Sequence, residues 1–90
     1  MFTFRSAALA QRLAERRERR AQLLLSQEAI SRALQSQARG DGEGPSDADF
    51  SRLAVAMAIS ERADAAYLQL LSQVADEIIA CAQASARSRG

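Results

Sequence analysis

The sequence has no histidine, no tryptophan and a single cysteine, Cys81, among its 90 residues. Without histidine the chain lacks the commonest general base and the commonest metal ligand of proteins. One cysteine allows no internal disulfide and, with no histidine beside it, no ordinary zinc site. Cys81 also falls at a position of the helical repeat that apolar residues otherwise occupy, and this position favours a buried thiol over a nucleophile. These absences predict a protein that is not an enzyme and that needs no metal or cofactor.

Proline occurs once and glycine four times, and all but one of these residues fall between Gly40 and Pro45. The rest of the chain is rich in alanine, leucine, glutamine, arginine and glutamate, which favour helix. No apolar run approaches the roughly 20 residues that a membrane span needs. We therefore expect an all-α protein with no membrane span, and the lone cysteine favours a cytoplasmic location.

The segment RGDGEGPSDAD, residues 39–49, separates two helical stretches. Gly40 suits the left-handed position that follows a helix end, and the glycines and proline after it prevent the helix from continuing. Ser46 and Asp49 approximate a capping box at the start of a second helix. We predict a single domain with one helix over about residues 5–38, a linker over 39–46 and a second helix over about 47–86.

Both helical stretches repeat at alternating steps of three and four residues, which is the spacing of a coiled-coil seam. In the first stretch the predicted seam positions are Leu9, Leu13, Arg16, Arg20, Leu23, Gln27, Ile30, Leu34 and Gln37. In the second they are Phe50, Leu53, Met57, Ser60, Asp64, Tyr67, Leu71, Val74, Ile78, Cys81 and Ser85. Folding the chain back at the linker predicts an antiparallel two-helix coiled-coil hairpin.

The expected register places Arg16 opposite Leu71 and Arg20 opposite Tyr67, with apolar pairs toward both ends of the hairpin. Asp64 then lies about one turn from Arg20, so that it can meet the arginines of the seam. A charged residue at a seam position can fix the register of two helices. We predict that Arg16, Arg20 and Asp64 set the register or make charged contacts.

Charge is divided unevenly along the chain. Residues 1–39 carry eight arginines against three glutamates, a net charge of +5, and residues 40–90 carry four arginines against eight acids, a net charge of −4. A basic half that its own acidic half can neutralise needs no anionic polymer as a partner. The alternative is a basic dimer that lays its arginines along nucleic-acid phosphates, which the interrupting glutamates and the lack of aromatic residues there disfavour.

The segment LAVAMAI, residues 53–59, is apolar on every side of its helix, whereas a two-helix hairpin covers only one stripe of each helix. Val55, Ala56 and Ile59 should therefore stay exposed. The same is expected of Leu24, Leu25, Leu68, Leu70 and Ile79.

An exposed apolar strip on a small domain indicates an interface. The partner is either a second copy, giving a homodimeric four-helix bundle, or another helical protein. We favour the homodimer for the isolated chain. The predicted partner-binding residues are Leu24, Leu25, Val55, Ile59, Leu68 and Ile79.

The opening MFTFRSAALAQRLAERRERRAQLLLSQ resembles the start of the FliJ/YscO-type stalk proteins of bacterial type III export systems. Those proteins are antiparallel two-helix coiled coils associated with the export ATPase and with export chaperones. The resemblance implies a protein-binding adaptor or chaperone-like subunit of a type III secretion or flagellar export apparatus, with Arg16, Arg17, Arg19 and Arg20 as candidates for partner contact. This chain is much shorter than those stalks, and a small helical secretion chaperone fits its length better.

Overall fold

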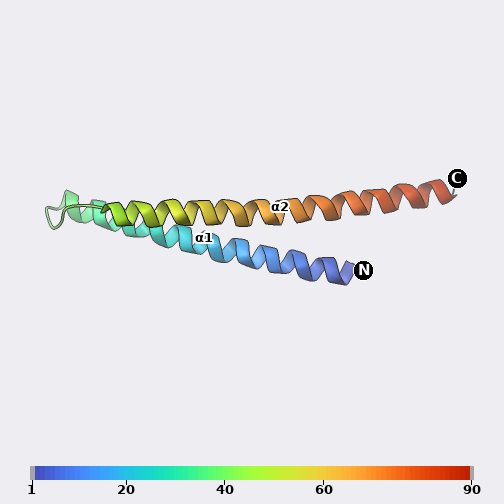
Figure 1. Cartoon of the computed structure of the whole chain (residues 1–90), viewed down its shortest axis with the longest axis horizontal. Coiled ribbons are helices and arrows are strands. Elements are labelled where there is room, and N and C mark those ends of the chain that lie inside the picture. The colour runs from blue at the N-terminus through green and yellow to red at the C-terminus, as the bar shows by residue number, and fades with distance from the viewer. Residues whose placement is uncertain (1, 90) are drawn as a thin grey trace.

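The computed structural model describes residues 2–89, with side chains described for residues 5–87. Two helices, α1 (Phe2–Ala38) and α2 (Asp47–Arg89), run antiparallel and form a hairpin (Figure 1). Over this part of the chain there is no strand, and the predicted all-α hairpin is confirmed. Both helices are longer than expected at their free ends, where residues near 5 and 86 were predicted as the limits. Neither described helix has an apolar stretch long enough to cross a membrane.

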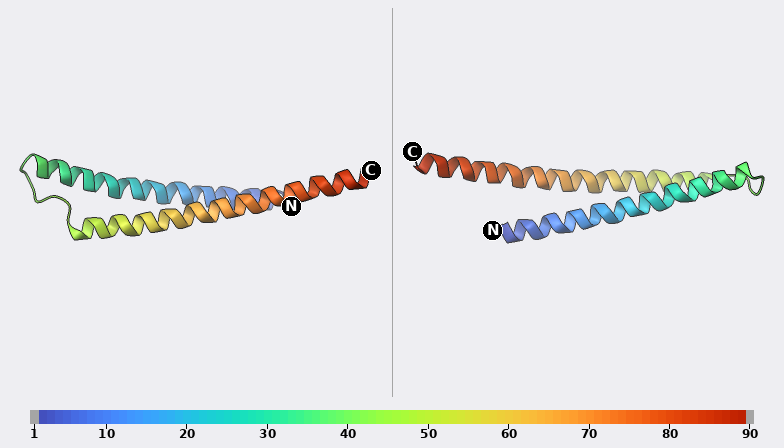
Figure 2. Two further views of the ribbon diagram at one scale, coloured as in Figure 1. Left: turned by 90° about the horizontal axis from the view of Figure 1, so that it is seen from above. Right: turned by 180° about the vertical axis from the view of Figure 1, so that it is seen from behind.

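The hairpin is a rod that measures 75 × 19 × 17 Å. Its radius of gyration is 21.1 Å, against about 12 Å for a compact chain of this length. In Figure 1 the ribbons overlap near the linker and separate toward the start of α1, and in the view from above in Figure 2 the reverse holds. The helices therefore cross at an angle. All views also show α2 running past the start of α1 (Figures 1 and 2).

A Schellman motif ends α1 at Gly40, whose φ is 81°. The Gly40 N–H donates to the Gln37 carbonyl at 3.0 Å, and the Asp41 N–H donates to the Ser36 carbonyl at 2.9 Å. These bonds satisfy carbonyls that the helix itself leaves without a donor. Glycine is the residue that reaches this left-handed conformation at least cost, so the predicted helix end is confirmed.

The linker then turns back along the last turn of α1. Gly44 has a φ of 88°, and a Cβ atom at this position would lie 2.6 Å from the Gln37 Oε1 atom. The linker backbone therefore runs directly beside the end of α1. As a result, α2 begins short of the end of α1, which two perpendicular views show (Figures 1 and 2).

A reciprocal capping box starts α2. The Asp49 N–H donates to Ser46 Oγ at 3.2 Å, and the Ser46 N–H donates to Asp49 Oδ2 at 2.9 Å. The bond from the Ser46 backbone, helped by the Ser46 hydroxyl and by nearby Arg52, holds the pKa of Asp49 below its ordinary value of 3.8. The predicted start of the second helix at Asp47 is confirmed.

The contact between the helices uses only part of the predicted seam. On α2 the covered or partly covered positions include Leu53, Ala56, Ser60, Ala63, Tyr67, Leu70 and Val74. On α1 they include Leu9, Leu13, Arg16, Leu23, Ser26, Ile30 and Ala33. The prediction was wrong for the exposed seam candidates Arg20, Gln27, Leu34, Gln37, Phe50, Met57, Leu71, Ile78, Cys81 and Ser85. It was also wrong for Ala56, Ile59 and Leu70, which are partly covered although they were expected to be exposed.

Side-chain size explains the corrected contact. Ser26 on α1, and Ala56, Ser60 and Ala63 on α2, are small residues that let two helix backbones approach closely. Larger residues such as Met57 would hold the helices further apart at these positions. The hairpin therefore turns small side chains inward and leaves many large apolar side chains outside.

The register also differs from the prediction, by about one helical turn. Arg16 was expected opposite Leu71, but it contacts Tyr67 and Asp64 instead. The path of the linker is the physical reason. Because the linker turns back before α2 begins, each residue of α2 lies beside an earlier part of α1 than a tighter connection would give.

The hairpin has almost no buried core. Ser60, Val74 and Ile30 are 5–9% exposed, and none of the described side chains is less than 2% exposed. The accessible surface is 7060 Å², whereas a compact protein of 9.7 kDa would have about 5,100 Å². The rod therefore keeps about 1,900 Å² more surface in water than a compact chain of the same mass.

Candidate protein-binding surfaces

A charged centre lies midway along the hairpin. Arg16 Nε donates to Asp64 Oδ1 at 2.6 Å, and Arg20 Nη2 lies 3.6 Å from Asp64 Oδ2. The Arg16 guanidinium also lies 5.3 Å from the centroid of the Tyr67 ring, within the range of a cation–π contact. One carboxylate of α2 thus engages two arginines of α1, as the charge pattern predicts.

The other charged contacts of α1 are more exposed. Arg5 Nη2 lies 2.6 Å from Glu77 Oε1 and joins the two helices near the start of α1. Arg12 and Glu15 pair within α1 at 3.4 Å. Pairs of this kind contribute little to stability because water screens them. Arg17 and Arg19 are exposed, and Arg19 lies at the edge of a groove.

That groove is open to solvent, has a volume of about 460 Å³ and follows one side of the helix contact. On its α2 wall the apolar side chains are Val55, which is 58% exposed, Ala56, and Ile59, which is half-buried. A smaller hollow of about 190 Å³, which Leu25 helps to line, adjoins it. We define this groove by the residues Arg19, Gln22, Ser26, Arg52, Val55 and Ile59.

An apolar stripe follows α2 on the other side of the helix contact. We define the stripe as Phe50, Met57, Leu71 and Ile78, which are 41–52% exposed. They belong to one series with a seven-residue period, in which Asp64 holds the middle place, so they share a face of α2.

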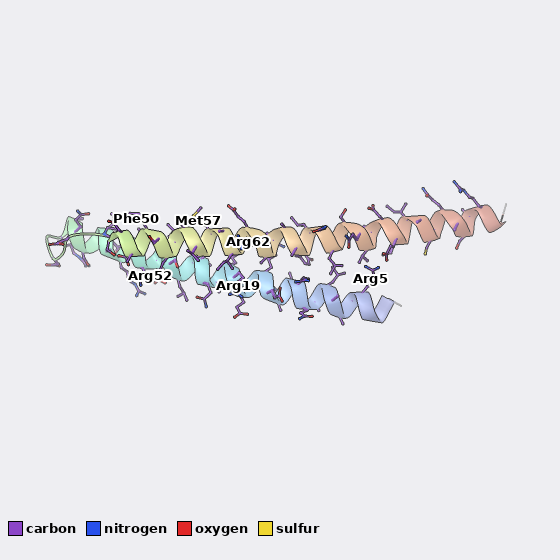
Figure 3. The ribbon with its side chains drawn as sticks, viewed as in Figure 1. Arg5, Arg19, Phe50, Arg52, Met57 and Arg62 are labelled. Atoms are coloured by element: carbon purple, nitrogen blue, oxygen red, sulfur yellow. The ribbon has the colours of Figure 1, made fainter. Side chains whose placement is uncertain are left out.

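The groove and the stripe lie on opposite sides of the hairpin. Met57 follows the covered residue Leu53 by one turn of the helix, whereas the groove residue Arg52 directly precedes Leu53. At about 100° per residue these offsets point to opposite sides of the contact. In Figure 3 the labels of Phe50 and Met57 lie along one edge of the hairpin, and those of Arg52 on α2 and Arg19 on α1 lie toward the opposite edge.

Five of the six predicted partner-binding residues divide between these two surfaces. Leu24, Leu25, Val55, Leu68 and Ile79 are 53–60% exposed, whereas Ile59 is half-buried in the wall of the groove beside the helix contact. Val55, Ile59 and Leu25 lie at the groove and its adjoining hollow. By helical spacing from Arg20 and Leu71, we place Leu24 and Leu68 on the side of the stripe. Ile79 belongs to neither surface.

Sequence reasoning missed the stripe because it assigned these same residues to the seam. Their seven-residue period was visible in the sequence. The sequence also contains a second series of the same period, through Ala56, Ala63 and Leu70, and the hairpin uses this series for its contact. The signal that distinguishes the two series is side-chain size, because the series that begins with Ala56 and Ala63 has the small residues that a close helix contact prefers.

Cys81 is a free and exposed thiol, and its predicted burial in the seam is wrong. The reason is that α2 runs past the start of α1, and residues 75–87 are all exposed. Among the side chains that the structure describes, no cluster of three or more histidine, cysteine or acidic residues could hold a metal ion.

Comparisons with models of known protein families, with curated proteins and with solved structures each found no match. The two candidate surfaces are therefore defined by the geometry and the charges of this chain alone.

Proposed function

We propose that this hairpin is a non-catalytic, protein-binding subunit, an adaptor or chaperone-like protein that works by packing against other helices. The observation that carries the proposal is the distribution of side-chain size. Small residues such as Ala56 and Ala63 lie at the contact between α1 and α2, whereas Phe50, Met57 and Leu71 lie outside it. A hairpin that functions without a partner would gain more folding free energy by burying the large apolar residues at the contact between its own helices.

The energetic consequence favours association. Full burial of one large apolar side chain contributes about 1.5–3 kcal/mol, and the stripe alone offers four such side chains. A 90-residue chain with so little core has a small stability of its own. Any helix that covers the stripe or the groove therefore stabilises the hairpin as it binds.

The two surfaces suit two modes of helix packing. The stripe is long and repeats every seven residues, as in the core of a four-helix bundle. The groove combines the apolar side chains of Val55 and Ile59 with Arg19 and Arg52, one from each helix. An amphipathic helix with acidic flanks matches that combination. The partners proposed are therefore a second copy of this chain, another helical protein, or both.

A cytoplasmic role in a bacterial type III secretion or flagellar export apparatus remains the proposed setting. Its support is the resemblance of the first 27 residues to the stalk proteins of those systems, together with the two-helix form of the chain. In that setting the hairpin would cover an apolar helix of an export partner.

Nucleic-acid binding has less support, because Arg16 and Arg20 already engage Asp64. A titration of labelled duplex DNA at two salt concentrations tests it directly, since phosphate contacts give an affinity that falls steeply with salt. Affinity with that salt dependence near physiological ionic strength would favour the nucleic-acid reading over protein binding.

The proposal is tested by linking stability to association. If the apolar surfaces bind helices, the unfolding temperature of the hairpin rises with its own concentration or with that of an added partner. Ile59→Asp should weaken retention of partner proteins from an extract of the native organism while most helicity remains, and Gln69→Asp, which places the same charge at an exposed polar position of α2, should not. Two results together would contradict the proposal. The wild type would be a monomer whose unfolding temperature does not depend on concentration, and it would retain the same proteins from the extract, in the same amounts, as Ile59→Asp does.

A further inference from the structure

On the side of the hairpin that carries the stripe, apolar and charged residues occupy different regions along the rod. This distribution indicates what covers the stripe. Near the linker it presents Phe50 and Met57, and near the other end it presents Leu71 and Ile78. Asp64 lies midway between these apolar ends and is only partly exposed. The surface is therefore apolar at both ends and charged at its middle.

Further charged residues belong to the middle of this side. Arg17 precedes Arg20 by three residues on α1, and Glu61 precedes Asp64 by three residues on α2, so each pair shares a helix face. Arg17, Arg20 and Glu61 are exposed. At the middle of the stripe side, α1 thus contributes arginines and α2 contributes acids.

Resting on the proposed function, we infer that the stripe is covered by a second copy of this chain, with the two hairpins side by side and their linkers at the same end. The two-fold axis then runs parallel to the rods and places α1 of each copy against α2 of the other. The product is a four-helix bundle in which every pair of neighbouring helices is antiparallel.

Charge selects this arrangement over the one with linkers at opposite ends. With linkers at the same end, Arg17 and Arg20 of one copy face Glu61 and Asp64 of the other. With linkers at opposite ends, α1 packs against α1 and α2 against α2, so that like charges meet at the middle. The net charges of +5 on residues 1–39 and −4 on residues 40–90 extend the same preference along the rod.

The apolar residues that would meet between the two copies, and the surface area available for an interface, also fit the four-helix bundle. The layer nearest the linker combines Leu34 and Phe50 of both copies, which are 49% and 52% exposed in the single hairpin. A layer beyond the charged middle combines Leu13 and Leu71 of both copies. A standard interface buries about 800 Å² on each partner, and each hairpin exposes about 1,900 Å² more than a compact chain of its mass.

Single thiols at the two ends of the rod test the arrangement. Cys81 is exposed and marks the free end of α2, and Glu43→Cys in a Cys81→Ser background marks the exposed linker. Donor-labelled and acceptor-labelled samples are mixed in three ways: two linker labels, two Cys81 labels, or one of each. Energy transfer is then measured together with the mass from sedimentation equilibrium.

With linkers at the same end, transfer is severalfold higher in the two like-labelled mixtures than in the mixed one, because labels at opposite ends are separated by most of the 75 Å length. The mass is twice the 9.7 kDa of one chain. The reverse pattern of transfer, high only in the mixed sample, would overturn the inference and would show linkers at opposite ends.

A stripe variant and its control complete the test. Met57→Glu should shift the mass to that of one chain and abolish transfer, whereas Gln69→Glu, which adds the same charge at an exposed position away from the stripe, should leave both unchanged. A monomeric wild type that still binds another helical protein through these surfaces would overturn the homodimer and leave the proposed function standing. A monomer that binds nothing would remove both.

Discussion

Arg16 and Asp64 join the two helices at the middle of the hairpin, with 2.6 Å between Nε and Oδ1. The side chains are 27% and 32% exposed, which makes this the most shielded of the described ion pairs. Arg16 at the same time covers the ring of Tyr67. One side chain of α1 therefore holds two neighbouring positions of α2, and it does so only in the register observed.

Loss of this pair should weaken the hairpin. Asp64→Asn removes the charge and is expected to lower the free energy of unfolding by about 1 kcal/mol, a value between those of exposed and buried charged hydrogen bonds. Urea unfolding at fixed protein concentration measures it. Glu28→Gln is the control, because Glu28 and Arg32 pair within α1 with 54% and 73% of their side chains exposed. Equal losses for the two variants would show that the Arg16–Asp64 pair has no special weight.

The capping box predicts a pH dependence. Because the folded-state pKa of Asp49 lies below its ordinary value of 3.8, the ionised carboxylate stabilises α2 above that pH. The contribution is lost as the pH falls from 3.8 through the lower, folded-state pKa. Asp49→Asn should reduce this part of the acid transition, followed by circular dichroism against pH. An acid transition identical to that of the wild type would mean that Asp49 contributes nothing to it.

The two linker glycines Gly40 and Gly42 should respond oppositely to alanine. Gly40→Ala forces a side chain into a φ of 81° and should cost about 1–2 kcal/mol. At Gly42 φ is not in that region, and a new Cβ would lie 3.8 Å from the Ser36 Cβ, an ordinary contact. Gly42→Ala should therefore be neutral or slightly stabilising. Thermal unfolding of both variants measures the difference, and a Gly40→Ala variant as stable as the wild type would contradict the Schellman assignment.

The thiol of Cys81 should react freely in the folded protein, since α1 does not extend over this end of α2. A thiol reagent should modify it in native buffer at a rate close to that in denaturant, and Cys81→Ser should show no reaction. Strong protection of the native thiol would mean that another chain covers the end of α2.

The features that the sequence predicted correctly are local ones. Gly40 and the pair Ser46 and Asp49 act through backbone bonds within a few residues, so their geometry follows from the residues themselves. The pairing of arginines with Asp64 also followed, because long charged side chains tolerate a shift in register.

The features that it did not predict depend on distant parts of the chain. Met57 and Ala56 are neighbours in sequence, and which of them faces α1 depends on how closely the two backbones can approach. The register depends on the route of the linker past Gln37, which no periodic pattern records. The exposure of the stripe followed from these two choices.

The returning linker also has a consequence for how insertions would act on this protein. A seven-residue repeat allows the helices neighbouring alignments that differ by one heptad, about 10.5 Å, and each offers a similar apolar pattern. A slide of one heptad would bring Arg16 beside Ser60 or Val74 in place of Tyr67. Adding or removing a few residues among 41–43 would therefore leave each helix intact and change only which alignment the tether can reach. In this hairpin the length of the linker, together with Arg16, selects among the possible alignments of α1 and α2. A larger protein would distinguish such alignments by the shape of its core.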